Sequence, residues 1–178
     1  MKIWHGVWTL CCIFILTGCT SQLLAPLPTP VGDLVTELPP VGTVAYLNTS
    51  SDTVAVGKTL VVDVEIKNVE QLFGMALQMV FNPTQLEVVD SATTEPGVQI
   101  THGGFLSPDY VQENQVDNAT GTVSYILLQV APTEPANGQG ILATLVLRGK
   151  ASGKLDISIS ELLLSDPDGN SISVTIVQ

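Results

Sequence analysis

Apolar and polar residues alternate with a period of two over most of the chain from Thr43 onward. Successive side chains of a β-strand point to opposite faces, so this period predicts strands with one buried face. The pattern is clearest in three segments, whose apolar positions on one side are Leu60, Val62, Val64 and Ile66; Phe73, Met75, Leu77, Met79 and Phe81; and Val123, Tyr125 and Leu127. No segment shows a 3.6-residue apolar stripe of helical length.

Glycine and proline interrupt these runs at intervals that are typical of short strands joined by turns. We therefore predict an all-β domain, a two-sheet jelly-roll sandwich of about nine strands. Pro83 follows the run that ends at Phe81, and proline cannot donate a hydrogen bond to a neighbouring strand. Asn82 before it is disfavoured in the helical region. These residues predict a tight corner, of the kind by which a chain passes between packed sheets, with a new strand in residues 85–89.

The N-terminal residues carry the features of a bacterial export signal. Lys2 is followed by an apolar stretch from Trp8 to Leu16, which is too short to span a bilayer comfortably. The sequence Leu-Thr-Gly-Cys at 16–19 resembles a lipobox, in which the cysteine is diacylated and becomes the new N-terminus. We predict a lipoprotein signal peptide at 1–18 with Cys19 as the lipidation site. An ordinary signal peptide and an uncleaved anchor are the alternatives.

Residues 19–43 are rich in proline, which favours extended polyproline II structure. We predict that this segment tethers the domain of residues 44–178 to the membrane, so that the exported protein is lipid-anchored at the cell envelope or cell surface. A leader without function is the alternative. The three cysteines of the chain are Cys11, Cys12 and Cys19. The predicted domain therefore has neither a disulfide framework nor a thiol nucleophile.

The charge and the polar residues argue against nucleic-acid binding and against catalysis. The net charge is −11 with only six Lys and Arg, whereas phosphate binding needs clustered cations. No Ser–His–Asp or zinc-binding set can be assembled around His102, which we interpret as a loop residue. The segment 165–171, with Asp166, Asp168 and Asn170, lacks the sixth-position glycine and the twelfth-position acid of an EF-hand loop, and predicts a hairpin turn instead. We predict no enzyme activity, metal or cofactor for this chain.

Several motifs, in their order and spacing over residues 44–178, resemble those of the cohesin family. The first is a Gly-x-x-hydrophobic motif within 57–62, and the second is a Tyr-Asp-Pro-x-x-Leu-like corner that stands here as Phe-Asn-Pro-Thr-Gln-Leu at 81–86. A Gly-x-hydrophobic-x-aromatic strand at 121–125 and a Gly-x-hydrophobic-Ala-x-hydrophobic segment at 140–145 come next. The hairpin "DPDGNSISV" precedes the last strand.

This resemblance implies a nine-stranded jelly roll that binds dockerins, which are calcium-loaded helical modules commonly attached to polysaccharide-degrading enzymes. Any calcium would then belong to the dockerin. In the best-known cohesin type, an outward Asn and Asp on the strand before the proline corner bond the dockerin, and their positions here are Gly74 and Ala76. Unless a loop or flap covers them, the outward residues that would form the partner-binding face are Gly74, Ala76, Gln78, Ser124, Ile126 and Leu128.

We predict a cell-surface module that docks dockerin-bearing secreted proteins and is linked to polysaccharide degradation. The main alternative is direct carbohydrate binding, which usually requires aromatic rings that stack on the sugar. No Trp follows the predicted signal, so Tyr46, Phe105 and Tyr110 are the residues left to form such a platform. A structural role in surface assembly is the third reading.

Overall fold

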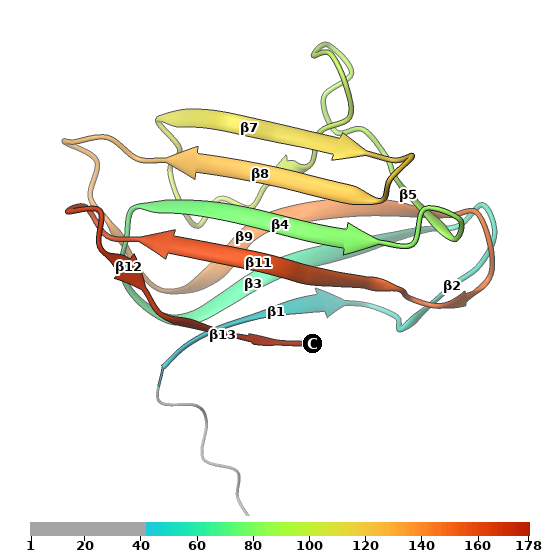
Figure 1. Cartoon of the computed structure of the whole chain (residues 1–178), viewed down its shortest axis with the longest axis horizontal. Coiled ribbons are helices and arrows are strands. Elements are labelled where there is room, and N and C mark those ends of the chain that lie inside the picture. Colours follow the sequence, from blue (N-terminus) through green and yellow to red (C-terminus); the bar gives the residue numbers. More distant parts are fainter. Residues whose placement is uncertain (1–41) are drawn as a thin grey trace, which may run out of the picture. The chain divides into compact units, whose positions relative to one another are not determined.

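The computed structural model describes residues 42–178 as two β-sheets packed face to face (Figure 1). The predicted signal peptide, Cys19 and nearly all of the predicted tether lie outside the described residues. Thirteen strands are present in residues 42–178, and nine of them have three or more residues. No helix that could cross a membrane occurs among these residues. The predicted two-sheet jelly-roll sandwich of about nine strands is confirmed.

The first sheet contains the two longest strands of the domain. Its order is β13 (Val174–Val177), β1 (Thr43–Thr49), β3 (Thr59–Leu72), β9 (Ala136–Gly149) and β5 (Leu86–Val88), with β6 (Thr101–His102) also paired to β9. The pair β1–β13 is parallel and the other pairs of this sheet are antiparallel. The first and last strands of the domain therefore lie side by side (Figure 1).

The second sheet is antiparallel throughout. Its order is β12 (Ser171–Ile172), β11 (Ile157–Ser165), β4 (Gly74–Phe81), β8 (Thr122–Leu128) and β7 (Tyr110–Asp117). A separate two-stranded ribbon is formed by β2 (Thr53–Val54) and β10 (Gly153–Lys154). Strands β4 and β8 are therefore the central pair of the second sheet, with β11 and β7 on their outer sides.

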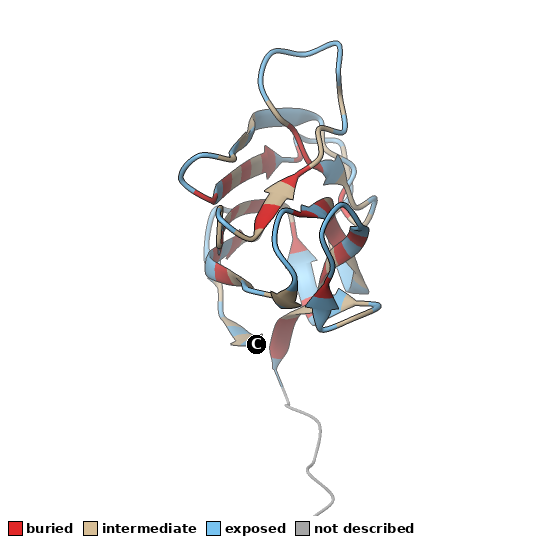
Figure 2. Cartoon of the chain, turned by 90° about the vertical axis from the view of Figure 1, so that its right-hand side faces the viewer, coloured by how far each residue is buried: buried red, intermediate tan, exposed pale blue. Residues whose placement is uncertain are grey.

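The core fills the space between the two sheets and is a single cluster of buried apolar residues. Most of the predicted inward positions are buried, including all four on β3 and all three on β8. Figure 2 shows the resulting alternation as bands of buried and exposed residues along the strands. Burial of one such side chain stabilises the fold by about 1.5–3 kcal/mol. Phe73 is an exception, because β3 ends on buried Leu72 and the alternation restarts at β4, which leaves Phe73 half-buried between the strands.

The corner at Asn82-Pro83 carries the chain from the second sheet to the first, as predicted. The Asn82 side-chain Oδ1 accepts hydrogen bonds from the backbone N–H and the hydroxyl of Thr84, at 3.0 and 2.7 Å. The Asn82 carbonyl accepts the N–H groups of Gln85 and Leu86. Strand β5 then starts at Leu86 beside β9. The corner closes within four residues because Asn82 supplies both acceptors, its side-chain Oδ1 and its backbone carbonyl.

Gly121 packs against this corner from the turn between β7 and β8. The Phe81 N–H donates to the Gly121 carbonyl at 2.8 Å. Gly121 has a φ of 76°, and a Cβ there would collide with the Phe81 carbonyl and lie 2.8 Å from Pro83 Cδ. Only glycine fits this position, since both the backbone angle and the close approach exclude a side chain.

We expect Gly121→Ala to lower the free energy of unfolding by about 2–4 kcal/mol, because left-handed strain and a backbone collision add together. Gly104→Ala is the matched control, since Gly104 has a φ of 81° and nothing within 4 Å of its Cβ position. The free energy of unfolding of the control should fall by about 1 kcal/mol, the cost of the left-handed backbone strain alone. Urea denaturation of both variants measures the difference, and equal losses would contradict the role given to the corner.

Candidate functional site

The six residues predicted for a partner-binding face lie together on the central strands of the second sheet. Antiparallel pairing of β4 with β8 sets Gly74 opposite Leu128, Ala76 opposite Ile126 and Gln78 opposite Ser124. Their neighbours along the strands, among them Leu77 and Tyr125, point into the core. Because alternate residues point to opposite faces, the six lie on the side turned away from the first sheet.

The neighbouring strands widen this face with four residues that were not predicted to belong to it. On β11, Leu163 is opposite Ala76 and Glu161 is opposite Gln78. On β7, Tyr110 is opposite Leu128 and Glu113 is opposite Ile126. We call these residues together the β4–β8 face: Gly74, Ala76, Gln78, Ser124, Ile126, Leu128, Tyr110, Glu113, Glu161 and Leu163. The period of two predicts which side each strand turns outward, but not which strands are neighbours.

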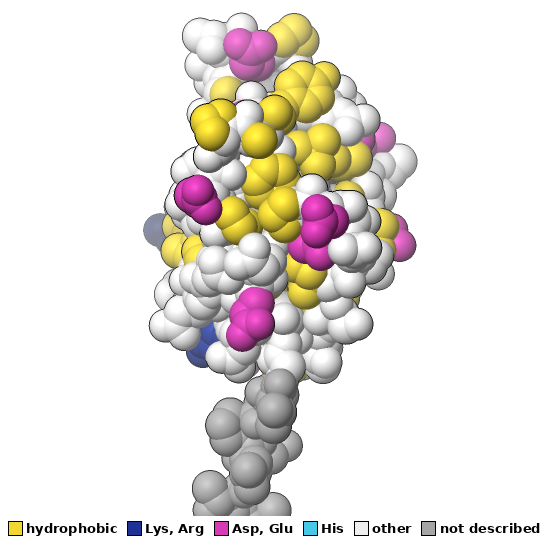
Figure 3. All heavy atoms as spheres, turned by 90° about the vertical axis from the view of Figure 1, so that its left-hand side faces the viewer, with side chains coloured by type: hydrophobic (Ala, Val, Ile, Leu, Met, Phe, Trp, Pro, Cys, Tyr) yellow, Lys and Arg dark blue, Asp and Glu magenta, His cyan; other side chains and the backbone are white. Residues whose placement is uncertain are grey.

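The apolar half of the β4–β8 face contains the largest exposed apolar side chains of the second sheet. Tyr110 is 58%, Leu163 57% and Leu128 39% exposed. A shallow hollow of about 230 Å³ is lined by Leu128 and Leu163 together with Ala76, Ile126 and Ser165. Figure 3 looks at the end of the sandwich where β8 and β11 end, and apolar side chains gather there between acidic ones.

Gly74 is buried and is not itself available to a partner. A Cβ at this position would lie 2.7 Å from Leu128 Cδ2 and 2.8 Å from Ser165 Oγ. The missing side chain therefore makes room for Leu128 and Ser165, which lie over it. Ala76 is half-buried and remains part of the accessible surface. The sequence correctly predicts the side of the sheet on which Gly74 lies, but the prediction that Gly74 is exposed there is wrong.

The polar half of the β4–β8 face contains a hydrogen bond between side chains of its two central strands. The Gln78 side-chain amide donates a hydrogen bond to Ser124 Oγ at 2.8 Å. This pair links β4 to β8 across the outer surface. The face therefore changes from apolar at the Leu128 end to polar beyond Ile126, and a partner that covers it meets both halves.

The hairpin at 165–171 is a turn held by its own side chains, as predicted. Asp166 Oδ1 accepts the N–H groups of Asp168 and Asn170, and its Oδ2 accepts the Asn170 side-chain amide. The side-chain amide of Asn170 first, and then the backbone N–H groups of Asn170, Asp168 and Gly169, keep the pKa of Asp166 below its ordinary value. The carboxylate is already satisfied by the turn. Within residues 42–178 no group of three or more His, Cys, Asp or Glu is placed to hold a metal ion.

His102 serves the structure of the domain. Its Nε2 lies 2.7 Å from the Leu106 carbonyl and its Nδ1 lies 3.0 Å from the Tyr125 hydroxyl. An N–H at Nε2 that donates to the carbonyl leaves Nδ1 to accept from the tyrosine. Burial raises the pKa of Tyr125 to about 12. His102 lies in the short strand β6 rather than in a loop, and both of its ring nitrogens have a partner.

The three aromatic residues considered for a sugar-binding platform do not come together. Tyr46 lies on β1 of the first sheet and Tyr110 on β7 of the second. Phe105 packs against Gly140 at the core. The Lys67 ammonium lies 4.7 Å from the centre of the Tyr46 ring, so one face of that ring is already covered. These three residues therefore form no common platform.

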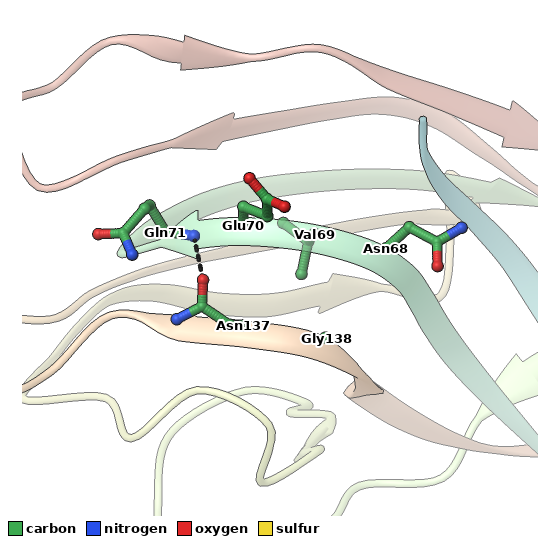
Figure 4. Close-up of a pocket in the computed structure, with 6 residues that line it drawn as sticks. All are labelled: Asn68, Val69, Glu70, Gln71, Asn137 and Gly138. Carbon is green, nitrogen blue, oxygen red and sulfur yellow. Dashed lines mark hydrogen bonds between the residues drawn. The ribbon is translucent and has the colours of Figure 1, made fainter. Parts of the chain in front are cut away.

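A second hollow, of about 570 Å³, lies where β3 and β9 lose their regular pairing (Figure 4). Asn68 and Gln71 have positive φ values there, and the Gln71 N–H donates to Asn137 Oδ1 at 2.8 Å. Figure 4 shows the side chains of Asn68, Glu70 and Asn137 pointing in different directions. Because they do not converge, this hollow is not a built binding site.

Comparison with known proteins identifies the family. The family model described as "Cohesin domain" matches residues 46–177. A chain of a type II cohesin–X-dockerin complex from Acetivibrio cellulolyticus superposes with a TM-score of 0.66 and 17% identity, covering 76% of this chain and 95% of that one. A type II cohesin from Bacteroides cellulosolvens gives 0.65 and 17%, covering 76% and 95%. A chain from a complex of an A. cellulolyticus scaffoldin cohesin with a dockerin gives 0.52 and 19%, covering 76% and 94%. A comparison with curated proteins gave no match.

On the outer face of the first sheet, polar side chains form hydrogen bonds with one another. One of these groups is a carboxylate, so the stability of the domain depends on pH. The Tyr46 hydroxyl and the Asn48 amide both donate to the Glu65 carboxylate. These hydrogen bonds, that of Tyr46 first, lower the pKa of Glu65. They favour the charged form, so their contribution to stability is complete above the ordinary pKa of glutamate and is lost as the pH falls through the folded value.

We expect Tyr46→Phe to raise the pKa of Glu65 and to lower the free energy of unfolding at neutral pH by about 1 kcal/mol, the usual contribution of one hydrogen bond. The stability difference from the wild type should shrink at pH values below the folded pKa of Glu65. NMR titration of the carboxyl carbon and urea denaturation at two pH values measure both effects. An unchanged Glu65 pKa in the variant would refute the assignment.

Proposed function

Because the chain belongs to the cohesin family, we propose that its domain binds a dockerin module and so docks a dockerin-bearing secreted protein. The observation that carries this proposal is the β4–β8 face, an exposed sheet surface with apolar side chains at its centre. Two of the similar structures come from complexes that contain a cohesin and a dockerin. A binding module of this kind needs no catalytic residue, so the proposed role is not enzymatic.

The exposed apolar residues of the face support an interface with a protein. Leu128 is opposite Tyr110 in the β7–β8 pair, and Leu163 lines the same hollow as Leu128, so these residues are not scattered singly over the surface. A contiguous apolar patch with a polar rim is typical of protein interaction sites. The hollow lined by Leu128 and Leu163 would receive an apolar side chain of the partner.

We propose that the dockerin is recognised mainly by packing of apolar side chains rather than by polar contacts. The resemblance set Gly74 and Ala76 at the positions of an outward Asn and Asp, and neither residue has a polar side chain. Ile126 and Leu128 stand beside them on β8. A partner helix could therefore lie close to the sheet and bury these side chains, each with a free-energy gain that grows with the apolar area removed from water. No cofactor is proposed for this chain, and calcium would be held by the dockerin.

Attachment to the cell surface completes the proposed role. The lipobox-like sequence at 16–19 and the proline-rich residues 19–43 support a lipid anchor at Cys19 followed by a tether. Two acyl chains give stable membrane attachment where a single chain does not. The partner would be a secreted protein, and we propose one concerned with polysaccharide degradation.

Replacing Cys19 with serine tests the anchor. In a bacterial host, Cys19→Ser should leave the membrane fraction or remain unprocessed, because no sulfur is present to carry the diacyl group. Cys12→Ser, a change inside the predicted signal, should be processed and fractionate as the wild type does. Cell fractionation and mass spectrometry measure both. Unchanged fractionation and mass in Cys19→Ser would rule out lipidation at this residue.

Replacing Ile126 with aspartate tests the face. Ile126→Asp should weaken dockerin binding by at least about 2 kcal/mol, the scale of an interface hot spot, because it sets a charge at the apolar centre. Folding should change far less, since the inward side of β8 stays intact. Calorimetry with calcium-loaded dockerins encoded by the same organism measures the affinity.

Val61→Asp is the matched control for that experiment. Val61 is 47% exposed and lies on β3 of the first sheet, so the same chemical change there should leave dockerin binding intact. If Ile126→Asp unfolds the domain, the outward assignment of Ile126 is wrong. Tight binding of plant polysaccharides by the wild type, without any dockerin partner, would replace docking with direct carbohydrate binding.

A further inference from the structure

The cations of the described chain are confined to one side of the fold. The five Lys and Arg residues of 42–178 lie on β3, β9 and β10 or in the turns beside them, and they are Lys58, Lys67, Arg148, Lys150 and Lys154. Strands β4, β7, β8, β11 and β12 contain no Lys or Arg. In the end view of Figure 3, basic side chains appear only at the margin. The second sheet therefore presents apolar, neutral polar and acidic side chains but no basic one.

Two carboxylates stand on opposite sides of the apolar centre of the β4–β8 face. Glu161 on β11 is next to Gln78, and Glu113 on β7 is next to Ile126. From β11 to β7 there are three strand spacings of about 4.8 Å, which separates the two rows by about 14 Å. An α-helix with its side chains is about 10–12 Å wide. A single helix that follows the direction of the strands would thus lie between the two carboxylates.

Neither carboxylate is neutralised by the domain itself. The one salt bridge among residues 42–178 joins Arg148 to Glu87 on the first sheet. Within the same residues, the side chains of Glu113 and Glu161 have no hydrogen-bond partner. Glu161 is exposed and Glu113 half-buried. Their charges remain available to a partner.

Resting on the proposed function, we infer that this face selects a dockerin whose contacting helix carries an apolar stripe flanked on both sides by Lys or Arg. The apolar stripe covers Ala76, Ile126 and Leu163, and the flanking cations reach Glu161 on one side and Glu113 on the other. A dockerin with acidic flanks would instead place like charges together, which disfavours its association. Glu113 and Glu161 are therefore specificity-determining residues.

Charges at the rim act mainly on the rate of association. Opposite charges steer the two surfaces together and speed encounter by roughly tenfold or more at low salt. The effect falls with ionic strength, since the Debye length shortens from about 10 Å at 0.1 M to about 3 Å at 1 M salt. The apolar centre sets how long the complex lasts, and the two glutamates decide which dockerins form it.

The test uses the full-length chain in detergent and calcium-loaded dockerin modules encoded by the same organism. Each dockerin is made in two versions, with the exposed positions beside its apolar helix stripe set to Lys in one and to Glu in the other. Both dockerin versions are tested against the wild-type chain and against a double variant of it, Glu113→Lys with Glu161→Lys. The control is Glu70→Lys, an exposed position on β3 of the first sheet. Association and dissociation rates are measured in low and high salt.

We expect the wild type and the Glu70→Lys control to associate at least about tenfold faster with the Lys version in low salt, and the double variant to prefer the Glu version. Equal rates for the two versions, or the same preference in wild type and double variant, would overturn the inference while docking itself stands. Failure of the wild type to bind either version of any dockerin would overturn the proposed function and this inference with it.

Discussion

The pairing of β4 with β8 is the interaction on which both the core and the proposed site depend. Each of these strands alternates strictly, so Leu77, Tyr125 and their inward neighbours fill the space between the sheets. The residues between them are thereby turned outward. A slip of one residue in this register would move the whole inward set to the surface and bury the outward one. The register that holds the core therefore also fixes the β4–β8 face.

The corner after β4 carries the same constraint to the other sheet. Asn82 closes the turn with its side chain and its carbonyl, and Pro83 prevents β4 from continuing. Gly121 accepts the Phe81 N–H at the point where β8 is about to begin. The end of β4 and the start of β8 are thus tied together by backbone contacts, which limits the ways in which the two strands can pair.

Local patterns predict most of the fold and half of the candidate site. The alternation around Val62, Leu77 and Tyr125 depends on neighbouring residues alone, and it predicts the strands and their inward faces correctly except at Phe73. The neighbours of the β4–β8 pair could not be predicted in this way, because the pairing of Leu163 with Ala76 joins residues far apart in the sequence. The burial of Gly74 could not be predicted for the same reason, because it depends on where Leu128 and Ser165 lie.

The two outer faces of the sandwich differ in how far their polar groups are already satisfied. On the first sheet, Glu65 accepts from Tyr46 and Asn48, Asp63 accepts from Thr144, and Arg148 pairs with Glu87. A partner that covered this face would have to break or bury these bonds, at a cost for each polar group left unpaired. On the second sheet, the one side-chain pair across the β4–β8 face is Gln78 with Ser124, and its apolar residues gain free energy when they leave water. The same fold thus offers one face whose polar groups are already paired and one whose apolar side chains would be stabilised by the proposed partner.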